Sequence, residues 1–254
     1  MSLIGLDALR SYLDDYLRIA DEVADAAEAL NGLQVENSGR VERVATAVDA
    51  CAATIRMAAA AGAHCLLVHH GLFWGGLRPL VGPAYRRVAL LIQHDIALYS
   101  AHLPLDRHPH VGNNAVLARA LGVAMRGDFG EYRGAPIGVW GELGVGRDEL
   151  ARSLTACLGP PPRLLPFGPE RVERVGIVTG AGGALIAQAA AAGLDTFITG
   201  EGPHWTYFDA EELGLNVYYA GHYATETVGV RALGTHIAER FGVPVEFLDH
   251  PTGL

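Results

Sequence analysis

Short apolar runs alternate with Ala-rich segments along much of the chain. The runs 44–48 and 64–68 enclose an Ala-rich segment that ends at Gly62. Short apolar runs are typical of buried strands, and a glycine after an Ala-rich segment is typical of the end of a helix. A strand, a helix and a second strand in this order predict a parallel pair joined by a helical crossover.

The same pattern occurs a second time. Residues 41–74 align without a gap to residues 172–205, at a constant offset of 131 positions, and 14 of the 34 aligned residues are identical. Eight of the identities are Ala or Gly, but the others include the opening Val-Glu-Arg-Val and a closing Trp. The second copy predicts strands at 176–179 and 196–199 and a helix that ends at Gly193.

We therefore expect an α/β fold with two pseudo-symmetric α/β lobes that arose by internal duplication. The chain of 254 residues is long enough for this arrangement. The expected lobes are 1–126 and 172–254. Residues 127–171 contain "GPPPRLLPFGP", which is rich in Pro and Gly, and are expected to link the lobes.

Composition excludes several classes of function. All 19 basic residues are Arg, so the chain can neither form a Schiff base through Lys nor carry the lysine of a Walker A loop. The net charge of −9 argues against nucleic acid as the main partner. The three cysteines are odd in number and far apart, which indicates neither a disulfide framework nor a thiolate zinc site.

The beginning of the chain has acidic residues where a signal peptide would have basic and apolar ones. The sequence also contains no uninterrupted apolar run of the length that spans a membrane. We expect a cytoplasmic protein.

Two adjacent histidines, His69 and His70, follow the second predicted strand. Sites in open parallel sheets gather at the carboxyl ends of the strands. Neighbouring side chains of a regular strand point to opposite faces, so Gly71 is expected to end the strand at this place. Two ligands on diverging vectors suit two neighbouring ions better than one.

A His-x-x-x-acid pattern follows an apolar strand in each predicted lobe. His222 and Glu226 lie in a segment of helical spacing, so the two side chains share one helix face. His102 and Asp106 are flanked by prolines, which disfavour a helix, and four extended residues span about 13 Å. We therefore expect that His102 and Asp106 do not bind the same ion, and that one of them supports the site or faces a substrate.

Imidazole and carboxylate donors of this kind suit a divalent metal such as Zn, Fe or Mn. Four blocks, "LLVHHGLFWGG", "AHLPLDRHPHVGNN", "DTFITGE" and "YYAGHYATETVGVRAL", together with "NGLQVEN" at 31–37, resemble the signature blocks of the Nif-three-like dinuclear-metal family. Some members of that family are named GTP cyclohydrolase I type 2 homologues. The resemblance extends in order and spacing over nearly the whole chain.

The resemblance implies two divalent metal ions per chain, held at the interface of the lobes, with Glu226 as the bridge between them. The metal ligands that it implies are His69, His70, Asp106, His222 and Glu226. It also implies a toroidal homohexamer whose metal centres face an internal cavity. The position of His204 is variable in the family, and we expect this side chain to contact a substrate.

Two functions are compatible with this ligand set. The first is a metal-dependent hydrolase, in which His102 and His204 transfer protons and the resemblance indicates opening of the purine ring of a nucleotide substrate. The alternative is a metal-binding scaffold or metallochaperone without turnover. The two differ in the effect of removing His102, which would abolish turnover but leave the metal content almost unchanged.

The glycine-rich stretch "VTGAGGAL" at 178–185 follows a predicted strand and precedes a predicted helix. It lacks the full G-x-G-x-x-G pattern of a dinucleotide site. The other copy of the repeat builds the same turn as "VDACAAT", so a structural turn is the better interpretation. The helix N-terminus at this place could still hold a substrate phosphate.

Overall fold

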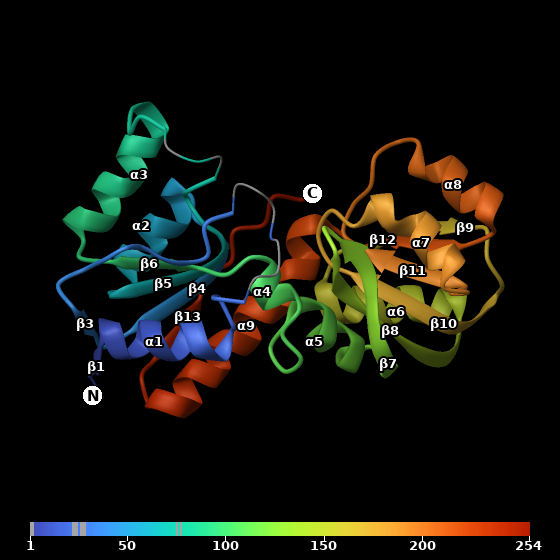
Figure 1. Cartoon of the computed structure of the whole chain (residues 1–254), viewed down its shortest axis with the longest axis horizontal. Coiled ribbons are helices and arrows are strands. Elements are labelled where there is room, and N and C mark those ends of the chain that lie inside the picture. The colour runs from blue at the N-terminus through green and yellow to red at the C-terminus, as the bar shows by residue number, and fades with distance from the viewer. Residues whose placement is uncertain (1–2, 22–24, 26–28, 75, 77) are drawn as a thin grey trace. The chain divides into compact units, whose positions relative to one another are not determined.

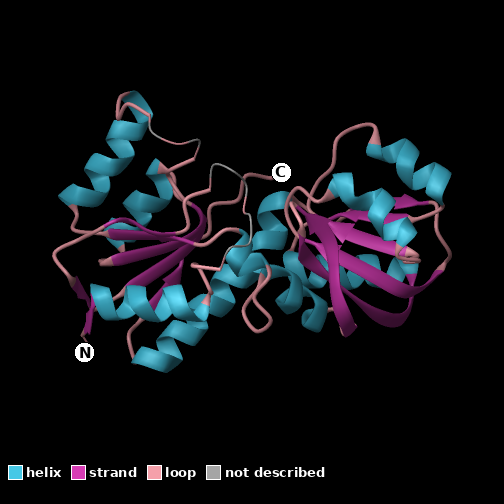
Figure 2. Cartoon of the chain, viewed as in Figure 1, coloured by secondary structure: helices cyan, strands magenta, loops and turns pink. Residues whose placement is uncertain are grey.

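The computed structural model describes residues 3–21, 25, 29–74, 76 and 78–254. The chain forms two compact units, each with its own sheet, helices and core (Figures 1 and 2). Unit 1 comprises Met1–Val111 and Gly229–His250, and unit 2 comprises Gly112–Val228 and Pro251–Leu254.

Unit 1 contains a five-stranded sheet in the order β13-β4-β5-β6-β2. The first four strands of this order are parallel, and β2 pairs antiparallel with β6 at the edge. The strands are β2 (Gly32–Val35), β4 (Val44–Asp49), β5 (Cys65–His70), β6 (Ala97–Ser100) and β13 (Val245–Phe247). A separate two-stranded antiparallel sheet consists of β1 (Ile4–Gly5) and β3 (Arg40–Val41).

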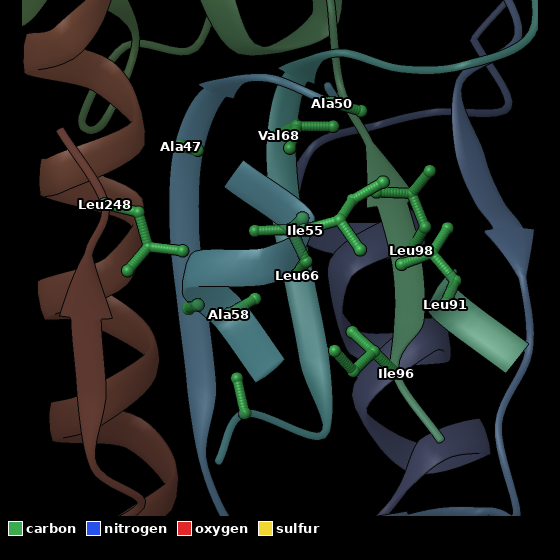
Figure 3. Packing of buried hydrophobic residues seen from close by; sticks show 12 residues of the cluster. Ala47, Ala50, Ile55, Ala58, Leu66, Val68, Leu91, Ile96, Leu98 and Leu248 are labelled. Carbon is green, nitrogen blue, oxygen red and sulfur yellow. The ribbon is translucent and has the colours of Figure 1, made fainter. Parts of the chain in front are cut away.

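Helices cover both faces of the unit 1 sheet, so its central strands are apolar on both sides (Figure 1). On one face Leu66 and Leu98 pack with Ile55 and Leu91 of the covering helices (Figure 3). On the other, Tyr99 donates a hydrogen bond to Asp14 at 2.9 Å. The helices are α1 (Leu6–Tyr16), α2 (Ala52–Ala60), α3 (Gly82–Gln93), the short α4 (Leu103–Asp106) and α9 (His222–Phe241), which belongs to unit 1 from residue 229 onward. None of the helices in the described part of the chain is long and apolar enough to cross a membrane.

Unit 2 contains a six-stranded sheet in the order β7-β8-β10-β11-β12-β9. Strands β10, β11 and β12 are parallel, and β8 and β9 pair antiparallel with β10 and β12. The strands are β7 (Ala124–Tyr132), β8 (Ala135–Gly146), β9 (Arg163–Pro166), β10 (Arg171–Val178), β11 (Thr196–Thr199) and β12 (Asn216–Tyr219).

Two apolar clusters cover the two faces of the unit 2 sheet. Ile177 and Ile198 pack with Leu117 and Leu154 on one face, whereas Phe197 packs in the cluster on the other. The helices are α5 (Asn113–Ala120), α6 (Arg147–Leu158), α7 (Ile186–Ala191), α8 (Thr206–Leu213) and the 3₁₀ turn η1 (Gly183–Leu185).

The α/β fold and both strand–helix–strand patterns expected from the sequence are confirmed. Gly62 and Gly193 follow α2 and α7 with φ angles of +67° and +68°, the left-handed conformation of a helix-ending glycine. In unit 1 four parallel strands, and in unit 2 three, are followed by an antiparallel edge strand. An origin by duplication stays a prediction.

The borders of the units differ from the expected lobes 1–126 and 172–254. Residues 127–171 contribute β8, α6, β9 and most of β7 to unit 2, because β8 pairs with β10 and β9 pairs with β12. The Pro- and Gly-rich stretch forms the connections on either side of β9. Residues 229–250 return to unit 1, where β13 pairs with β4, and Pro251–Leu254 belong to unit 2.

His108 lies after α4 and is buried against α1. Its Nδ1 accepts hydrogen bonds from the backbone amides of His110 and Val111, so its Nε2 carries the hydrogen and donates to the carbonyl of Tyr16 at 3.1 Å. Burial lowers the pKa of His108 to about 4. The folded protein therefore holds a neutral imidazole at this position.

This pKa predicts a loss of stability in mild acid. Because the folded pKa is below the unfolded value, the contribution of His108 is complete above about pH 6.5 and is lost as the pH falls from there toward 4. Between pH 7.5 and pH 5 the wild type should lose about 2 kcal/mol more of unfolding free energy than His108→Gln, which cannot titrate. Urea denaturation of both proteins at the two pH values measures this difference, and equal losses would contradict the assignment.

Candidate metal centre

Three histidines of unit 1 converge at the carboxyl ends of β5 and β6. His69 and His70 end β5, and His102 follows β6. The ring of His69 lies 4.6 Å from that of His70 and 5.0 Å from that of His102, and their candidate ligand nitrogens lie within 4.8 Å of one another. Adjacent parallel strands end at the same edge of the sheet, which brings these side chains together. With Asp106, they form what we call the unit 1 cluster.

Each of the three imidazoles is held by a hydrogen bond from Nδ1. His69 donates to the carbonyl of Ala101 at 2.9 Å, and His70 donates to Asp49 at 2.9 Å. Asp49 is the last residue of β4 and lies opposite His70 in the sheet register. Because the acceptors are oxygens without hydrogen, Nδ1 carries the proton, and a metal ion would be bound through Nε2.

His102 is held by two polar side chains that precede β2. Its Nδ1 donates to Asp25 at 2.7 Å, and its backbone amide donates to Asn31 at 2.8 Å. Asn31 in turn donates to Asp25 at 2.7 Å. The ring and the backbone of His102 are therefore fixed together by Asp25 and Asn31, which are not among the predicted site residues.

The expected extended path between His102 and Asp106 is wrong. Residues 103–106 form the short helix α4, with Pro104 in its first turn, where the missing amide hydrogen has no helical partner to lose. Asp106 is buried, and its carboxylate lies 3.5 Å from Nε2 of His69. The proposed separation of about 13 Å thus does not distinguish the roles of His102 and Asp106.

The turn after β5 explains the rest of the "HHGLFWGG" motif. A Cβ at position 71 would overlap the side chain of Gln34, whose carbonyl oxygen accepts a hydrogen bond from the amide of Leu72 at 2.7 Å. Trp74 donates to the carbonyl of Gly71 at 2.7 Å, and its ring lies edge-to-face with His102 at a centroid distance of 5.1 Å. Gly75 lies outside the described residues. The glycine and the tryptophan thus shape the surroundings of the histidines.

A second group, the unit 2 cluster, consists of His222, Glu226 and Glu201. His222 begins α9, and its Nε2 lies 3.1 Å from the carboxylate of Glu226, one turn later, as the sequence predicts. Its Nδ1 lies 2.8 Å from Glu201, which follows β11. The hydrogen bond to the buried Glu226 raises the pKa of His222 to about 9. At neutral pH the imidazole is therefore protonated on both nitrogens, and a bound metal would replace the proton on Nε2.

Two glycines make room for the unit 2 cluster. Gly180 has a φ angle of +68°, and a Cβ at this position would overlap the carboxylate of Glu226. A Cβ at Gly200 would lie 2.7 Å from Cα of His222. These close approaches require glycine for a steric reason that is independent of any phosphate.

The stretch "VTGAGGAL" is a structural turn. The amides of Gly180 and Gly182 donate to the hydroxyls of Thr225 and Thr199, each at 3.0 Å, and the amide of Gly183 donates to the carbonyl of Glu201 at 3.0 Å. The backbone donors that a phosphate would need are therefore used within the fold. This arrangement agrees with the interpretation that the sequence favoured.

His204 lies elsewhere in unit 2, in the loop before α8. Its ring packs edge-on against Phe208, with 5.7 Å between the ring centroids, and it lines a cavity. Its role as a substrate contact or in proton transfer stays a prediction.

The donor sets of both clusters fit a divalent metal ion. They contain only imidazole nitrogens and carboxylate oxygens, and all four histidines hold an oxygen acceptor on Nδ1, which is the usual arrangement of metal-binding histidines. The anchors Asp25, Asp49 and Glu201 were missed from the sequence. Asp49 and Glu201 each lie at the end of a predicted parallel strand, which is the signal that could have identified them.

The close approach at Gly180 leads to a test. Gly180→Ala should displace the Glu226 carboxylate and lower the zinc affinity at least tenfold. Gly122→Ala is the control, because Gly122 has a similar φ of +75° but nothing within 4 Å of a Cβ. Both variants should lose about 1–2 kcal/mol of unfolding free energy, because alanine disfavours the left-handed backbone conformation. Competition with a chelating zinc indicator measures the affinity, and equal affinities in the two variants would refute this role of Gly180.

Comparison with known proteins places the chain in a family. The family model described as Duf34/NIF3 (NGG1p interacting factor 3) matches residues 6–252. A GTP cyclohydrolase 1 type 2 homolog of Deinococcus radiodurans is 46% identical over 99% of this chain and 95% of its own length. A protein of the same name from Treponema pallidum is 45% identical over 89% of this chain and 92% of its own.

Solved structures show the same fold. Protein ybgI, described as of unknown function, superposes with a TM-score of 0.92 at 40% identity and covers 99% of this chain and 100% of its own. TTHA1606 from Thermus thermophilus superposes with a TM-score of 0.90 at 44% identity, over 99% of this chain and 100% of its own. The family match, the identities and the shared fold agree, and this chain belongs to the Duf34/NIF3 family.

Proposed function

We propose that this protein is a dinuclear-metal-dependent hydrolase. The observation that carries the proposal is that three histidines, two in strand β5 and one at the start of α9, each engage an oxygen through Nδ1. Imidazoles fixed in this way present Nε2 to a metal with little loss of side-chain freedom on binding. The proposed ligands of two divalent ions are His69, His70, Asp106, His222 and Glu226.

The proposal assigns both clusters to one centre. The unit 1 cluster offers three of these donors and the unit 2 cluster offers two, whereas a single zinc ion takes about four ligands and a pair needs more. A carboxylate shared between the ions, which we assign to Glu226, reduces the number of donors required. The metal identity that we propose is Zn, Fe or Mn, because these ions accept mixed imidazole and carboxylate ligands.

When bound, the two ions would act as Lewis acids and lower the pKa of a water molecule. The chain itself contributes proton transfer through His102. Asp25 holds the proton of His102 on Nδ1, so that Nε2 can accept a second proton, and the Asp25 carboxylate stabilises the imidazolium that results. His102 can then return this proton to the leaving nitrogen of the substrate.

The substrate that we propose is a purine nucleotide, because relatives with 42–47% identity carry the name GTP cyclohydrolase 1 type 2 homolog. In the proposed reaction, a first water adds to the imidazole carbon of the purine, and cleavage of one of its C–N bonds opens the ring to a formamide. A second water hydrolyses the formamide, so that the carbon leaves as formate and both nitrogens remain on the pyrimidine as amines. The proposal also includes a cytoplasmic homohexamer, which rests on the family resemblance and on the charge pattern of the sequence.

Metal content tests the centre. The purified wild type should hold about two divalent ions per chain, and Glu226→Ala should lose most of them because the shared carboxylate is gone. Glu212→Ala is the matched control, since Glu212 is an exposed carboxylate of α8. Elemental analysis of the three proteins measures the content. A wild type that retains no metal after incubation with Zn, Fe and Mn would refute the centre.

Turnover separates a hydrolase from a metal-binding scaffold or metallochaperone. His102→Gln should lower formate release from GTP at least a hundredfold, the size expected for loss of a general acid or base, while its metal content stays at the wild-type value. His94 is an exposed histidine after α3, and His94→Gln should keep both the wild-type rate of formate release and the wild-type metal content. If the metal-loaded wild type releases no formate from purine nucleotides, the scaffold function replaces the hydrolase.

A further inference from the structure

A cavity of about 310 Å³ opens in unit 2 beside β9, β12 and α8. Its volume is near the lower end of the range for small-molecule sites. The residues of its lining that bear on ligand binding are Arg163, Gly202, His204, Tyr207, Phe208 and Tyr219. None of them is among the proposed metal ligands. Gly202 directly follows Glu201, so the wall of the cavity continues from the loop that anchors His222.

The wall beside β12 is fixed by hydrogen bonds and close packing. Thr206 donates to the carbonyl of Pro203, and the Tyr219 hydroxyl donates to the same threonine oxygen. A Cβ at Gly202 would lie 2.7 Å from the Tyr219 hydroxyl, so the loop packs directly on this ring. The cavity is therefore built into the fold rather than left by a loose loop.

Aromatic rings form the side of the cavity along α8. Tyr207 and Phe208 remain 38% and 49% exposed, although both are large apolar side chains. Edge-to-face contacts with Phe167 and His204 hold the two rings at centroid distances of 5.2 and 5.7 Å. Oriented, half-exposed aromatic rings at a cavity offer stacking surface to a planar ligand.

Arg163 supplies the positive charge. It pairs directly with Tyr219 across β9 and β12, which places both side chains on the same face of the sheet. Burial raises the pKa of Tyr219, and the positive charge of the Arg163 guanidinium opposes this rise by stabilising the phenolate. Among the described residues that line the cavity, Arg163 is the one permanent cation. Guanidinium groups bind phosphate and carboxylate through paired hydrogen bonds.

We propose that this cavity binds a planar aromatic or heteroaromatic ring that carries an anionic group. The ring packs against Tyr207 and Phe208, and the anion pairs with Arg163. In the proposed hydrolase, this cavity would be the subsite for the base of the nucleotide substrate, and that assignment rests on the function proposed above. The binding itself requires no metal, because none of the proposed ligands takes part in it.

Calorimetric titration of the full-length, metal-free protein with GMP tests the proposal. GMP combines a planar base with a phosphate, whereas guanosine lacks the anion and ribose 5-phosphate lacks the ring. GMP should bind more tightly than either. Phe208→Ala and Arg163→Gln should each weaken GMP binding at least tenfold, with circular dichroism confirming that both variants fold.

Matched controls lie nearby in the same unit. Trp205→Ala removes an exposed aromatic ring beside α8 that does not line the cavity, and Arg152→Gln removes an exposed arginine of α6. Both should bind GMP within twofold of the wild type. Equal GMP affinity in all four variants would overturn the proposal. A changed sedimentation coefficient for Phe208→Ala with unchanged GMP binding would also overturn it, since the aromatic face would then be a contact between copies of the chain.

Failure of the cavity proposal and failure of the proposed hydrolase function give different results. Cavity-dependent GMP binding by a protein that never retains metal would support the cavity and refute the hydrolase. Two bound ions together with formate release, but without any effect of Phe208→Ala or Arg163→Gln on GMP binding, would refute the cavity and support the hydrolase.

Discussion

The candidate centre depends on one interaction, the hydrogen bond from a histidine Nδ1 to a fixed oxygen. In His69 and His70 this bond determines which nitrogen carries the proton and how the ring is rotated. The bond of His70 to the charged Asp49 contributes about 1.5–3 kcal/mol, and the bond of His69 to the neutral carbonyl of Ala101 contributes about 0.5–1.5 kcal/mol; each favours one tautomer and one rotamer of its ring. Without these anchors, the same residues would be mobile imidazoles near the end of a strand rather than oriented ligands.

The folds of the two units supply the anchors. In unit 1, the parallel register places Asp49 of β4 opposite His70 of β5, so the pairing of the strands also pairs the carboxylate with the imidazole. In unit 2, Glu201 follows β11 and reaches His222 after the neighbouring strand β12. His70 and His222 are thus each anchored from an adjacent strand. Glycines at Gly180 and Gly200 permit the close approach of backbone and side chain that this arrangement needs.

The sequence predicted features that depend on local pattern. The parallel strand–helix–strand elements, the end of β5 before Gly71 and the helical pairing of His222 with Glu226 follow from periodicity and glycine positions, and all are present. The predicted extended conformation between His102 and Asp106 was wrong. Proline breaks a helix in its interior, but the first turn of a helix accepts it, and Pro104 lies in the first turn of α4.

Features that depend on pairing between distant segments were not accessible from one sequence. The assignment of residues 127–171 to the unit 2 sheet requires knowledge that β8 pairs with β10, and the return of β13 to unit 1 requires its pairing with β4. Asp25 lies 77 positions from His102 in the chain, and no local pattern connects the two residues. The blocks that resemble the family indicated candidate ligands but not the residues that orient them.

The most direct test is a crystal structure of the zinc-soaked full-length protein with anomalous diffraction recorded at the zinc edge. We expect anomalous peaks at bonding distance from Nε2 of His69, His70 and His222, with every Nδ1 hydrogen bond retained. Zinc bound through Nδ1, with the bonds to Ala101, Asp49 and Glu201 broken, would contradict this expectation. The absence of any peak at these histidines in fully soaked crystals would contradict it as well.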